Sequence, residues 1–273
     1  MKNLNWDRTF INLQEELEAD DYTLYSSELV IPLGKDTNWK SHFLDFKETN
    51  ALLIAGATAS GKSLFLNTIL YTLIKRLSPD QIKFVLIDPK RVEFPPYKES
   101  PYLYTDIVQE PSECVKTLIE LTKEMDRRFE LLADREELDI ESYNYSQKDK
   151  LPYIFILIDE LSDLMFTDGK NCEESLENLC QMGRAVGIHL VIATSRPEKS
   201  VLTDILRGNI LNHIGFATAS IEGSKIIIDE AGAESLLGKG DALLSLPHYS
   251  RLVRVQTPYL SDEEIKDNIK LHR

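Results

Sequence analysis

The chain has 273 residues, of which 42% are hydrophobic, so it is long enough to bury a full core and is not a disordered sequence. Its formal net charge of −14 repels nucleic acid at long range, which excludes a protein that coats DNA with a uniformly basic surface. No apolar run approaches the roughly 18 residues that a membrane-spanning helix needs, and the start is polar and acidic, so we expect a cytoplasmic protein without direct membrane insertion.

The first part of the chain is expected to form a small appendage that packs on a larger domain. Apolar residues recur at spacings of three and four from Trp6 to Leu17, which predicts a short amphipathic helix. Residues 28–33 have the pattern of a strand, and Pro32 and Gly34 are expected to stop it.

A glycine-rich segment follows the strand-like run 51–55 and leads into a helix predicted over 62–77. It fits the phosphate-binding pattern G-x-x-x-x-G-K-[ST], in which backbone amides surround phosphate oxygens, the lysine reaches the β- and γ-phosphates and the hydroxyl binds Mg²⁺. The predicted nucleotide-binding residues are Gly56, Ala57, Thr58, Ala59, Ser60, Gly61, Lys62, Ser63 and Leu64. The sequence therefore predicts an ATP site with Lys62 in catalysis and Ser63 as a metal ligand; the alternative is a strand-to-helix turn without a ligand.

One residue of this loop departs from the most favourable chemistry. Ala59 occupies a mid-loop position at which glycine would more freely take a positive φ. We expect that Ala59 either has a negative φ or carries backbone strain.

From residue 51 onward, strand-like apolar runs alternate with helical periodicity, which predicts a mostly parallel sheet with crossover helices. The predicted strands after the first are 82–87, 153–158, 188–193, 214–218 and 242–246, and the predicted helices after the loop begin at Pro111 or cover 173–184, 224–230 and 261–270. The helix after Pro111 has an apolar face from Val115 to Leu132, with Arg127 and Arg128 expected elsewhere. Residues 141–150 are expected to form a polar loop.

Two carboxylates, Asp159 and Glu160, follow the fully apolar run 153–158. They should emerge at the carboxyl end of a strand, the edge at which open α/β sheets bind ligands. Asp159 would hold Mg²⁺ through water, and Glu160 would orient or deprotonate the attacking water. The alternative is that the pair caps the next helix. Asp88 also ends a strand, but Pro89 after it makes a structural role equally possible.

Arg184 ends a helical stretch just before Gly187. A cation at this position favours the carboxyl end of a helix, and this structural role is one interpretation. The other is an arginine finger, which would project into the nucleotide site of a neighbouring subunit and stabilise charge on the transferred phosphoryl group.

Together these stretches resemble the FtsK/SpoIIIE family of double-stranded DNA translocases over about residues 29–255. The resemblance rests on the P-loop and on Ile31–Asp36, Ile87–Lys90, Leu157–Met165, Arg184–Leu190, Ala193–Pro197 and Ala231–Asp241. The last run has no general P-loop role and is the most specific to the family. The resemblance implies a RecA-like P-loop NTPase of the α/β class, with a mostly parallel central sheet flanked by helices, an N-terminal helix and strand appendage at residues 1–40 and the ATPase domain at 41–273.

The resemblance also implies a homo-oligomer, a hexameric ring in which ATP hydrolysis drives movement along double-stranded DNA. Arg184 would be the finger acting on the neighbouring subunit, and Arg196 and Lys225 would bind DNA phosphates from loops facing the channel. The alternative for the last two is that they are exposed surface cations. Six copies of sparse contacts concentrate positive charge in the pore, so the acidic net charge does not exclude DNA.

Three positions depart from the family pattern: Ala59 and Ser195 stand where glycine and glutamine are usual, and Ile221 stands where a second pore cation is common. The membrane region and winged-helix domain of chromosome-segregating members are not expected here, which is typical of a motor from a mobile element or phage. A second hypothesis is an FtsK-like ATPase that drives protein secretion. A third, a degenerate scaffold, is disfavoured by the intact Lys62, Ser63, Asp159 and Glu160.

Overall fold

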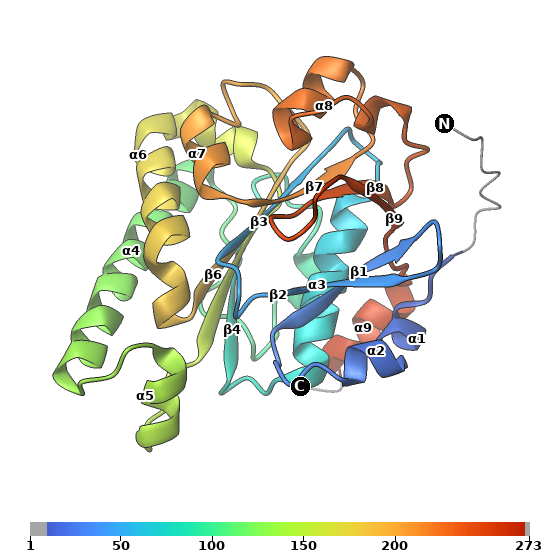
Figure 1. The fold of residues 1–273 in the computed structure, drawn as a ribbon. Helices are drawn as coiled ribbons and strands as arrows, with labels where there is room; N and C mark the ends of the chain where they lie inside the picture. Colours follow the sequence, from blue (N-terminus) through green and yellow to red (C-terminus); the bar gives the residue numbers. More distant parts are fainter. Residues whose placement is uncertain (1–9, 271–273) are drawn as a thin grey trace.

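The computed structural model describes residues 10–270, which form a nine-stranded sheet with helices on both faces (Figure 1). The order across the sheet is β2-β1-β9-β8-β7-β3-β6-β5-β4. The central strand and its neighbours on one side are parallel: β7 (Asn212–Phe216), β3 (Ala51–Ala55), β6 (Ile188–Thr194), β5 (Tyr153–Ile158) and β4 (Ile82–Ile87). An antiparallel extension follows: β8 (Asp241–Ser245), β9 (Val253–Gln256), β1 (Val30–Asp36) and β2 (Ser41–Asp45). The predicted α/β class with a largely parallel central sheet is confirmed.

The parallel strands β3, β4, β5 and β6 are apolar at most positions because both faces of the sheet are covered there. All residues of β3, β5 and β6 are buried, as expected for a sheet between two helical layers. The register pairs Ala55 with Thr194 and Ile158 with Ile192. The segments that follow β3, β4, β5 and β6 therefore meet at one edge of the sheet, where the candidate site residues are found.

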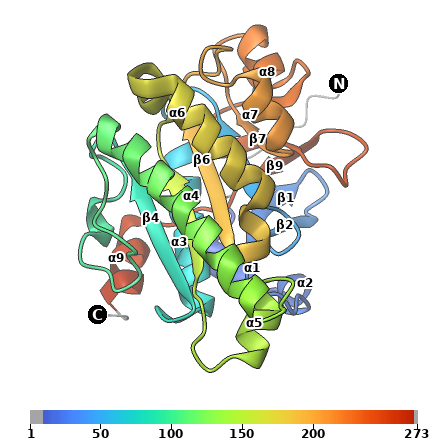
Figure 2. The ribbon, with the colours of Figure 1, turned by 90° about the vertical axis from the view of Figure 1, so that its left-hand side faces the viewer.

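Helices form a layer on each face of the sheet (Figures 1 and 2). One layer contains α3 (Lys62–Arg76), α9 (Asp262–Lys270) and α1 (Leu13–Glu18), and the other contains α4 (Pro111–Asp134), α6 (Leu161–Met182), α7 (Asp204–Asn209) and α8 (Ile221–Ile228). Figure 2 shows α4 and α6 packed side by side. The short helices α2 (Asp20–Thr23) and α5 (Ile140–Ser146) lie toward the end of the molecule opposite α8 (Figure 1).

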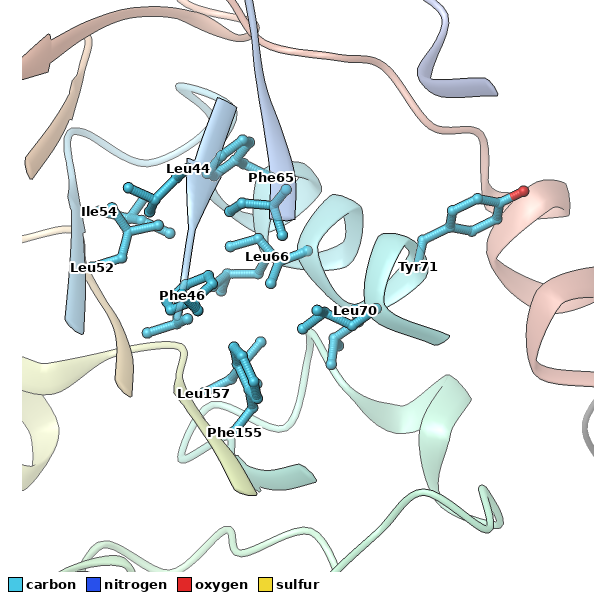
Figure 3. Packing of buried hydrophobic residues seen from close by; sticks show 14 of the residues in the cluster. Leu44, Phe46, Leu52, Ile54, Phe65, Leu66, Leu70, Tyr71, Phe155 and Leu157 are labelled. Carbon is cyan, nitrogen blue, oxygen red and sulfur yellow. The ribbon is translucent and has the colours of Figure 1, made fainter. Parts of the chain in front are cut away.

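The position of α3 is set by hydrophobic packing beneath the P-loop. Figure 3 shows Phe65, Leu66 and Leu70 of α3 with Ile54 of β3 and Phe155 of β5 in one buried cluster. Burying such side chains contributes about 1.5–3 kcal/mol each. This packing holds the start of α3, and with it the glycine-rich loop, against the carboxyl ends of the strands.

The N-terminal elements differ from the prediction. The helix begins at Leu13, because the side chain of Asn12 accepts the backbone N–H groups of Gln14 and Glu15, whereas Phe10 is exposed and outside the helix. Trp6 lies outside the described residues. The strand predicted to stop at Pro32 and Gly34 continues to Asp36 through a register shift between these two residues.

Further along the chain, two predicted elements are wrong in extent and one side chain is wrongly placed. Residues 141–150 were expected to be a loop, but α5 occupies Ile140–Ser146, started by a capping box between Asp139 and Ser142. The helix predicted over 173–184 is the second part of α6, which begins at Leu161 and is interrupted by the non-helical Asp168. Arg128 is buried with the apolar face of α4 rather than lying elsewhere.

The division of the chain at residue 40 stays a prediction. Residues 37–40 form the turn between β1 and β2, which pair with each other, and β1 also pairs with β9 of the main sheet. Within residues 10–270, every helix is too short or too polar to cross a bilayer.

Candidate nucleotide site

The loop between β3 and α3 has a backbone path that depends on small residues. Gly61, the N-cap of α3, has a φ of 123°, and a Cβ there would lie 2.6 Å from the backbone nitrogen of Gly240. A Cβ on Gly56 would lie 2.7 Å from the Cβ of Phe216. Ala59 has a φ of 61°, so of the two alternatives it adopts the left-handed conformation that an L-residue enters at a cost.

Hydrogen bonds attach this loop to three neighbouring segments. The N–H of Gly56 donates to the carbonyl of Thr194 at the end of β6, and the N–H of Ala57 donates to the carbonyl of Ala217 after β7. The carbonyl of Ser60 accepts the N–H of Gly240, before β8. The loop is therefore preorganised by strand ends that lie far from it in the sequence.

Lys62 and Ser63 occupy the first turn of α3. The Nζ of Lys62 donates to the carbonyl oxygens of Gly56 and Ala57, each at 2.9 Å, which places the ammonium inside the curve of the loop. Burial lowers the pKa of Lys62, while Glu160 and Asp159 oppose that shift. A buried ammonium at the N-terminus of a long helix is suited to bind phosphate.

Asp159 stands at the carboxyl end of β5 in an environment that disfavours its charge. Burial, then Glu93 and Asp88, raise the pKa of Asp159 to about 7. A divalent cation beside this carboxylate would offset that cost, and carboxylate and hydroxyl oxygens are ligands that Mg²⁺ accepts. Within residues 10–270, no group of three or more histidine, cysteine or acidic side chains could hold a metal by itself.

Glu160 is almost completely buried, with 1% of its surface exposed, and receives hydrogen bonds from several donors. Its carboxylate accepts from Lys90 Nζ at 2.6 Å, Thr194 Oγ1 at 2.7 Å and the N–H of Ser195 at 3.1 Å, and from the Ser195 hydroxyl. Burial alone would raise the pKa of Glu160, but these bonds outweigh it and hold the pKa at about 2. Glu160 is also the N-cap of α6, accepting the N–H of Ser162 at 3.4 Å, so the capping interpretation describes part of its contacts.

For Asp88, the structural interpretation is the one observed. Its carboxylate accepts the backbone N–H groups of Val92, Glu93 and Phe94. Asp88 therefore closes the loop that follows β4 and fixes the backbone on which Lys90 stands.

Arg184 lies far from this chain's own P-loop. It is exposed in the short helix η2 (Gly183–Val186) before β6, and its Nη1 donates to the carbonyl of Glu48 at 3.3 Å. Glu48 precedes β3, whereas the P-loop follows β3. Arg184 and the P-loop therefore lie at opposite ends of this strand, which is roughly 16 Å long. Arg184 also lines a surface cavity of about 690 Å³ at this opposite edge.

Arg196 and Lys225 lie on neighbouring elements. Arg196 follows β6, is exposed, and has its guanidinium 5.7 Å from the ring centroid of Phe166. Lys225 is an exposed residue of α8. The two elements touch, since a Cβ on Gly223 of α8 would lie 3.1 Å from Cγ of Pro197.

Sequence reasoning missed Lys90 and Thr194 as members of the site. Lys90 is 70 residues from its partner Glu160, and Thr194 is 34 residues away. The available signal was their position, because both lie at the carboxyl ends of strands predicted to be parallel.

The glycine-rich loop, its lysine, and the acidic pair at the end of a nearby parallel strand define a RecA-like P-loop ATPase. The chain belongs to the FtsK/SpoIIIE family, which residues 12–199 match. DNA translocase FtsK of Campylobacter jejuni is 42% identical over 260 residues, which cover 94% of this chain and 28% of that protein. DNA translocase FtsK of Helicobacter pylori strain J99 is 40% identical over 266 residues, covering 96% and 32%. The chain thus spans about a third of the length of these curated relatives.

Solved structures with the same fold include two at comparable similarity. The conjugation coupling protein TcpA of pCW3, in its monomer form with ATPγS, is 26% identical with a TM-score of 0.81, covering 97% of this chain and 74% of that one. The cytoplasmic domain of the type VII secretion ATPase EccC of Thermomonospora curvata is 25% identical with a TM-score of 0.84, covering 97% and 34%.

Proposed function

We propose that this chain is the motor of a cytoplasmic, ATP-driven translocase of double-stranded DNA that works as a hexameric ring. The proposal rests on one arrangement. Lys62, Asp159 and Glu160 lie together at the carboxyl ends of the parallel strands, whereas Arg184 lies at their amino ends. This arrangement contains the parts of an ATP-hydrolysing site except for the cation that stabilises charge on the transferred phosphoryl group.

Each residue of the site has a distinct task in this proposal. Lys62 and the amides of the loop bind the β- and γ-phosphates, and Glu160 orients or deprotonates the attacking water. Ser63 and Asp159 would hold Mg²⁺, which neutralises phosphate charge when bound. The raised pKa of Asp159 supports this role, because a bound cation would stabilise the charged carboxylate that its surroundings disfavour.

The placement of Arg184 supports a ring. In one subunit it is too far from the P-loop to act there, since it lies near Glu48 at the opposite edge. In a closed ring of identical subunits, each interface joins two different surfaces of the subunit. Arg184 would thereby complete the neighbour's site.

Duplex DNA is the proposed substrate because the curated relatives carry the name DNA translocase and because exposed cations stand at the end of β6 and on α8. Arg196 and Lys225 would contact phosphates along the ring's channel. Repetition of these contacts around a ring makes an acidic chain compatible with a polyanionic substrate.

The test measures ATP hydrolysis with and without linear duplex DNA at about 50 mM and about 200 mM salt, because phosphate contacts weaken as salt rises. We expect stimulation at low salt that declines at high salt, and no hydrolysis by Glu160→Gln. Arg196→Ala and Lys225→Ala should reduce stimulation, whereas Lys123→Ala, which removes an exposed lysine of α4, should not. Equal rates with and without DNA at both salt concentrations would refute the proposal.

The alternative, an ATPase that moves protein, is favoured by the likeness to EccC. The relatives named DNA translocase are more similar in sequence. Tight binding of a secretion-signal peptide together with no binding of DNA would favour this alternative.

A further inference from the structure

The carboxylate of Glu160 is saturated with hydrogen-bond donors. Oε1 accepts from the Thr194 hydroxyl, the Ser195 amide and, at longer range, the Ser162 amide. Oε2 accepts from Lys90 and from the hydroxyl and amide of Ser195. Since a carboxylate offers about four lone-pair sites, these donors leave none for a water molecule.

The same contacts keep Glu160 from acting as a general base. A general base must lie within hydrogen-bond reach of the proton that it takes, whereas the acceptor sites of Glu160 are occupied by Lys90, Thr194 and Ser195. A water molecule can therefore reach the Glu160 carboxylate only after one of these donors has left it. The residue proposed for catalysis is therefore held in a non-productive state by its neighbours.

Of these neighbours, Lys90 is the one best able to move. Its side chain is 44% exposed, in contrast to the buried Thr194, and its backbone is fixed by the contacts of Asp88 with the following residues. The flexible side chain can therefore leave Glu160 while the loop stays in place. Asp159 and Asp163 both act electrostatically on Lys90, so other carboxylates are close enough to attract its ammonium.

Ser195 connects Glu160 to a residue proposed to bind DNA. Its amide and hydroxyl both donate to Glu160, and the next residue is Arg196. The amide of Arg196 in turn donates to the Thr194 hydroxyl at 3.1 Å. A displacement of Arg196 by a phosphate would therefore be transmitted directly to the donors on Glu160.

Building on the proposed function, we propose that Lys90 and Ser195 are positioning residues that restrain Glu160, and that hydrolysis requires their hydrogen bonds to Glu160 to open. DNA bound at Arg196 promotes this opening through Ser195. Lys90 thus keeps ATP turnover low when no DNA is engaged.

The decisive experiment compares steady-state hydrolysis by the wild-type protein, Lys90→Met and Ser195→Ala in the absence of DNA. Removing one charge-assisted hydrogen bond that restrains Glu160 should raise the basal kcat by roughly tenfold or more. The KM for ATP should stay unchanged, because neither side chain is proposed to bind nucleotide. Lys90→Arg, which preserves the charged donor, should return the basal rate toward the wild-type value.

Arg91→Met is the matched control. Arg91 is the adjacent cation, is exposed and pairs with Glu110 rather than with Glu160, so its loss should leave the basal kcat unchanged. A rise of the basal kcat at unchanged KM that is reversed in Lys90→Arg is a result that a purely structural role of Lys90 would not give.

A decrease of kcat in both Lys90→Met and Ser195→Ala, with folding intact by circular dichroism, would overturn the proposal. A basal kcat of Lys90→Met equal to that of the control Arg91→Met would overturn it too. These outcomes are separable from failure of the proposed function. Wild-type protein that hydrolyses ATP without stimulation by DNA would refute DNA translocation, yet the basal rates of the variants would still test the restraint on Glu160.

Discussion

The backbone N–H of Gly240 donates a hydrogen bond of 2.9 Å to the carbonyl oxygen of Ser60, which joins the turn before β8 to the P-loop. On its other side, the carbonyl of Gly240 accepts the N–H of Thr257 at 2.8 Å. The run 231–241, which has no general role in P-loop proteins, thus includes a support for the phosphate-binding loop.

Replacing Gly240 by alanine should weaken ATP binding by about tenfold, or about 1.4 kcal/mol. Gly240 has a φ of 94°, and a Cβ there would lie 2.6 Å from the side-chain nitrogen of Gln256 and 2.7 Å from the hydroxyl of Thr257. Gly238→Ala is the control, because Gly238 also has a positive φ but a Cβ there would have no atom within 4 Å. Titration with a fluorescent ATP analogue measures both. Equal losses in the two variants would show that the packing at Gly240 does not matter.

Ala59→Gly should stabilise the protein slightly, by about 0.5–1 kcal/mol. Relief of the left-handed conformation gains about 1–2 kcal/mol, and the added freedom of the unfolded chain removes about 0.4–1 kcal/mol of it. Ala57→Gly, at a position of the same loop without a positive φ, should instead destabilise. Urea unfolding of both variants checks the prediction, which would be wrong if Ala59→Gly were the less stable protein.

The parallel strands and the P-loop could be predicted from the sequence because each depends on local patterns. Runs such as 153–158 are apolar throughout, and strand ends in a parallel sheet meet at one edge, so Asp159 was correctly expected at the carboxyl end of its strand. The strands β2 and β9 were missed. Both are short and mix polar with apolar residues, and they form only by pairing with distant segments.

Contacts of polar side chains could not be predicted, because periodicity assigns them to the surface by default. Arg128 is buried since its guanidinium finds Glu124 on the same helix and the carbonyl of Val186 across the interface. The restraint on Glu160 depends likewise on donors at the ends of two other strands, β4 and β6, and no local pattern encodes their distances.

Arg184→Ala should abolish ATP hydrolysis without weakening ATP binding, because the proposed contact is made only to a neighbour's nucleotide. Mixing Arg184→Ala with Lys62→Ala should restore part of the activity, since some interfaces would then pair an intact P-loop with an intact arginine. The hydrolysis rate is measured as a function of the mixing ratio. If the mixture hydrolysed no ATP at any ratio, Arg184 would not act between subunits.

Arg128→Met should lower the free energy of unfolding by about 2–4 kcal/mol, because it removes the buried donor of the Val186 carbonyl and leaves Glu124 with Arg127 as its cation. Arg127→Met removes a cation from the same carboxylate, but Arg127 is half exposed, so the loss should be within about 1 kcal/mol. Denaturant unfolding compares them. Val186 and Arg184 both belong to η2, so Arg128→Met should also displace Arg184 and reduce ATP hydrolysis. Unchanged hydrolysis would show that Arg128 stabilises the fold without positioning Arg184.

The stability of the protein should decrease as the pH falls below the ordinary range of histidine, because of His189. Its ring is buried beside Phe46 and Phe155, and burial lowers the pKa of His189 from 6.5 to about 3. The unfolded chain therefore takes up a proton that the folded chain refuses, and stability is lost as the pH falls from 6.5 toward the folded value. The slope is at most about 1.4 kcal/mol per pH unit, so about 2 kcal/mol should be lost between pH 6.5 and about pH 5.

His189→Phe should remove this component while filling the same aromatic cluster, and His248→Phe, at an exposed position, should retain it. Denaturant unfolding at about pH 5 and about pH 7.5 measures the difference for each protein. If wild type and His189→Phe lost equal stability on acidification, other groups would have to account for the loss. If the pH dependence were weaker in His189→Phe alone, this would show that burial in β6 keeps His189 neutral, because a charged ring would be poorly solvated there.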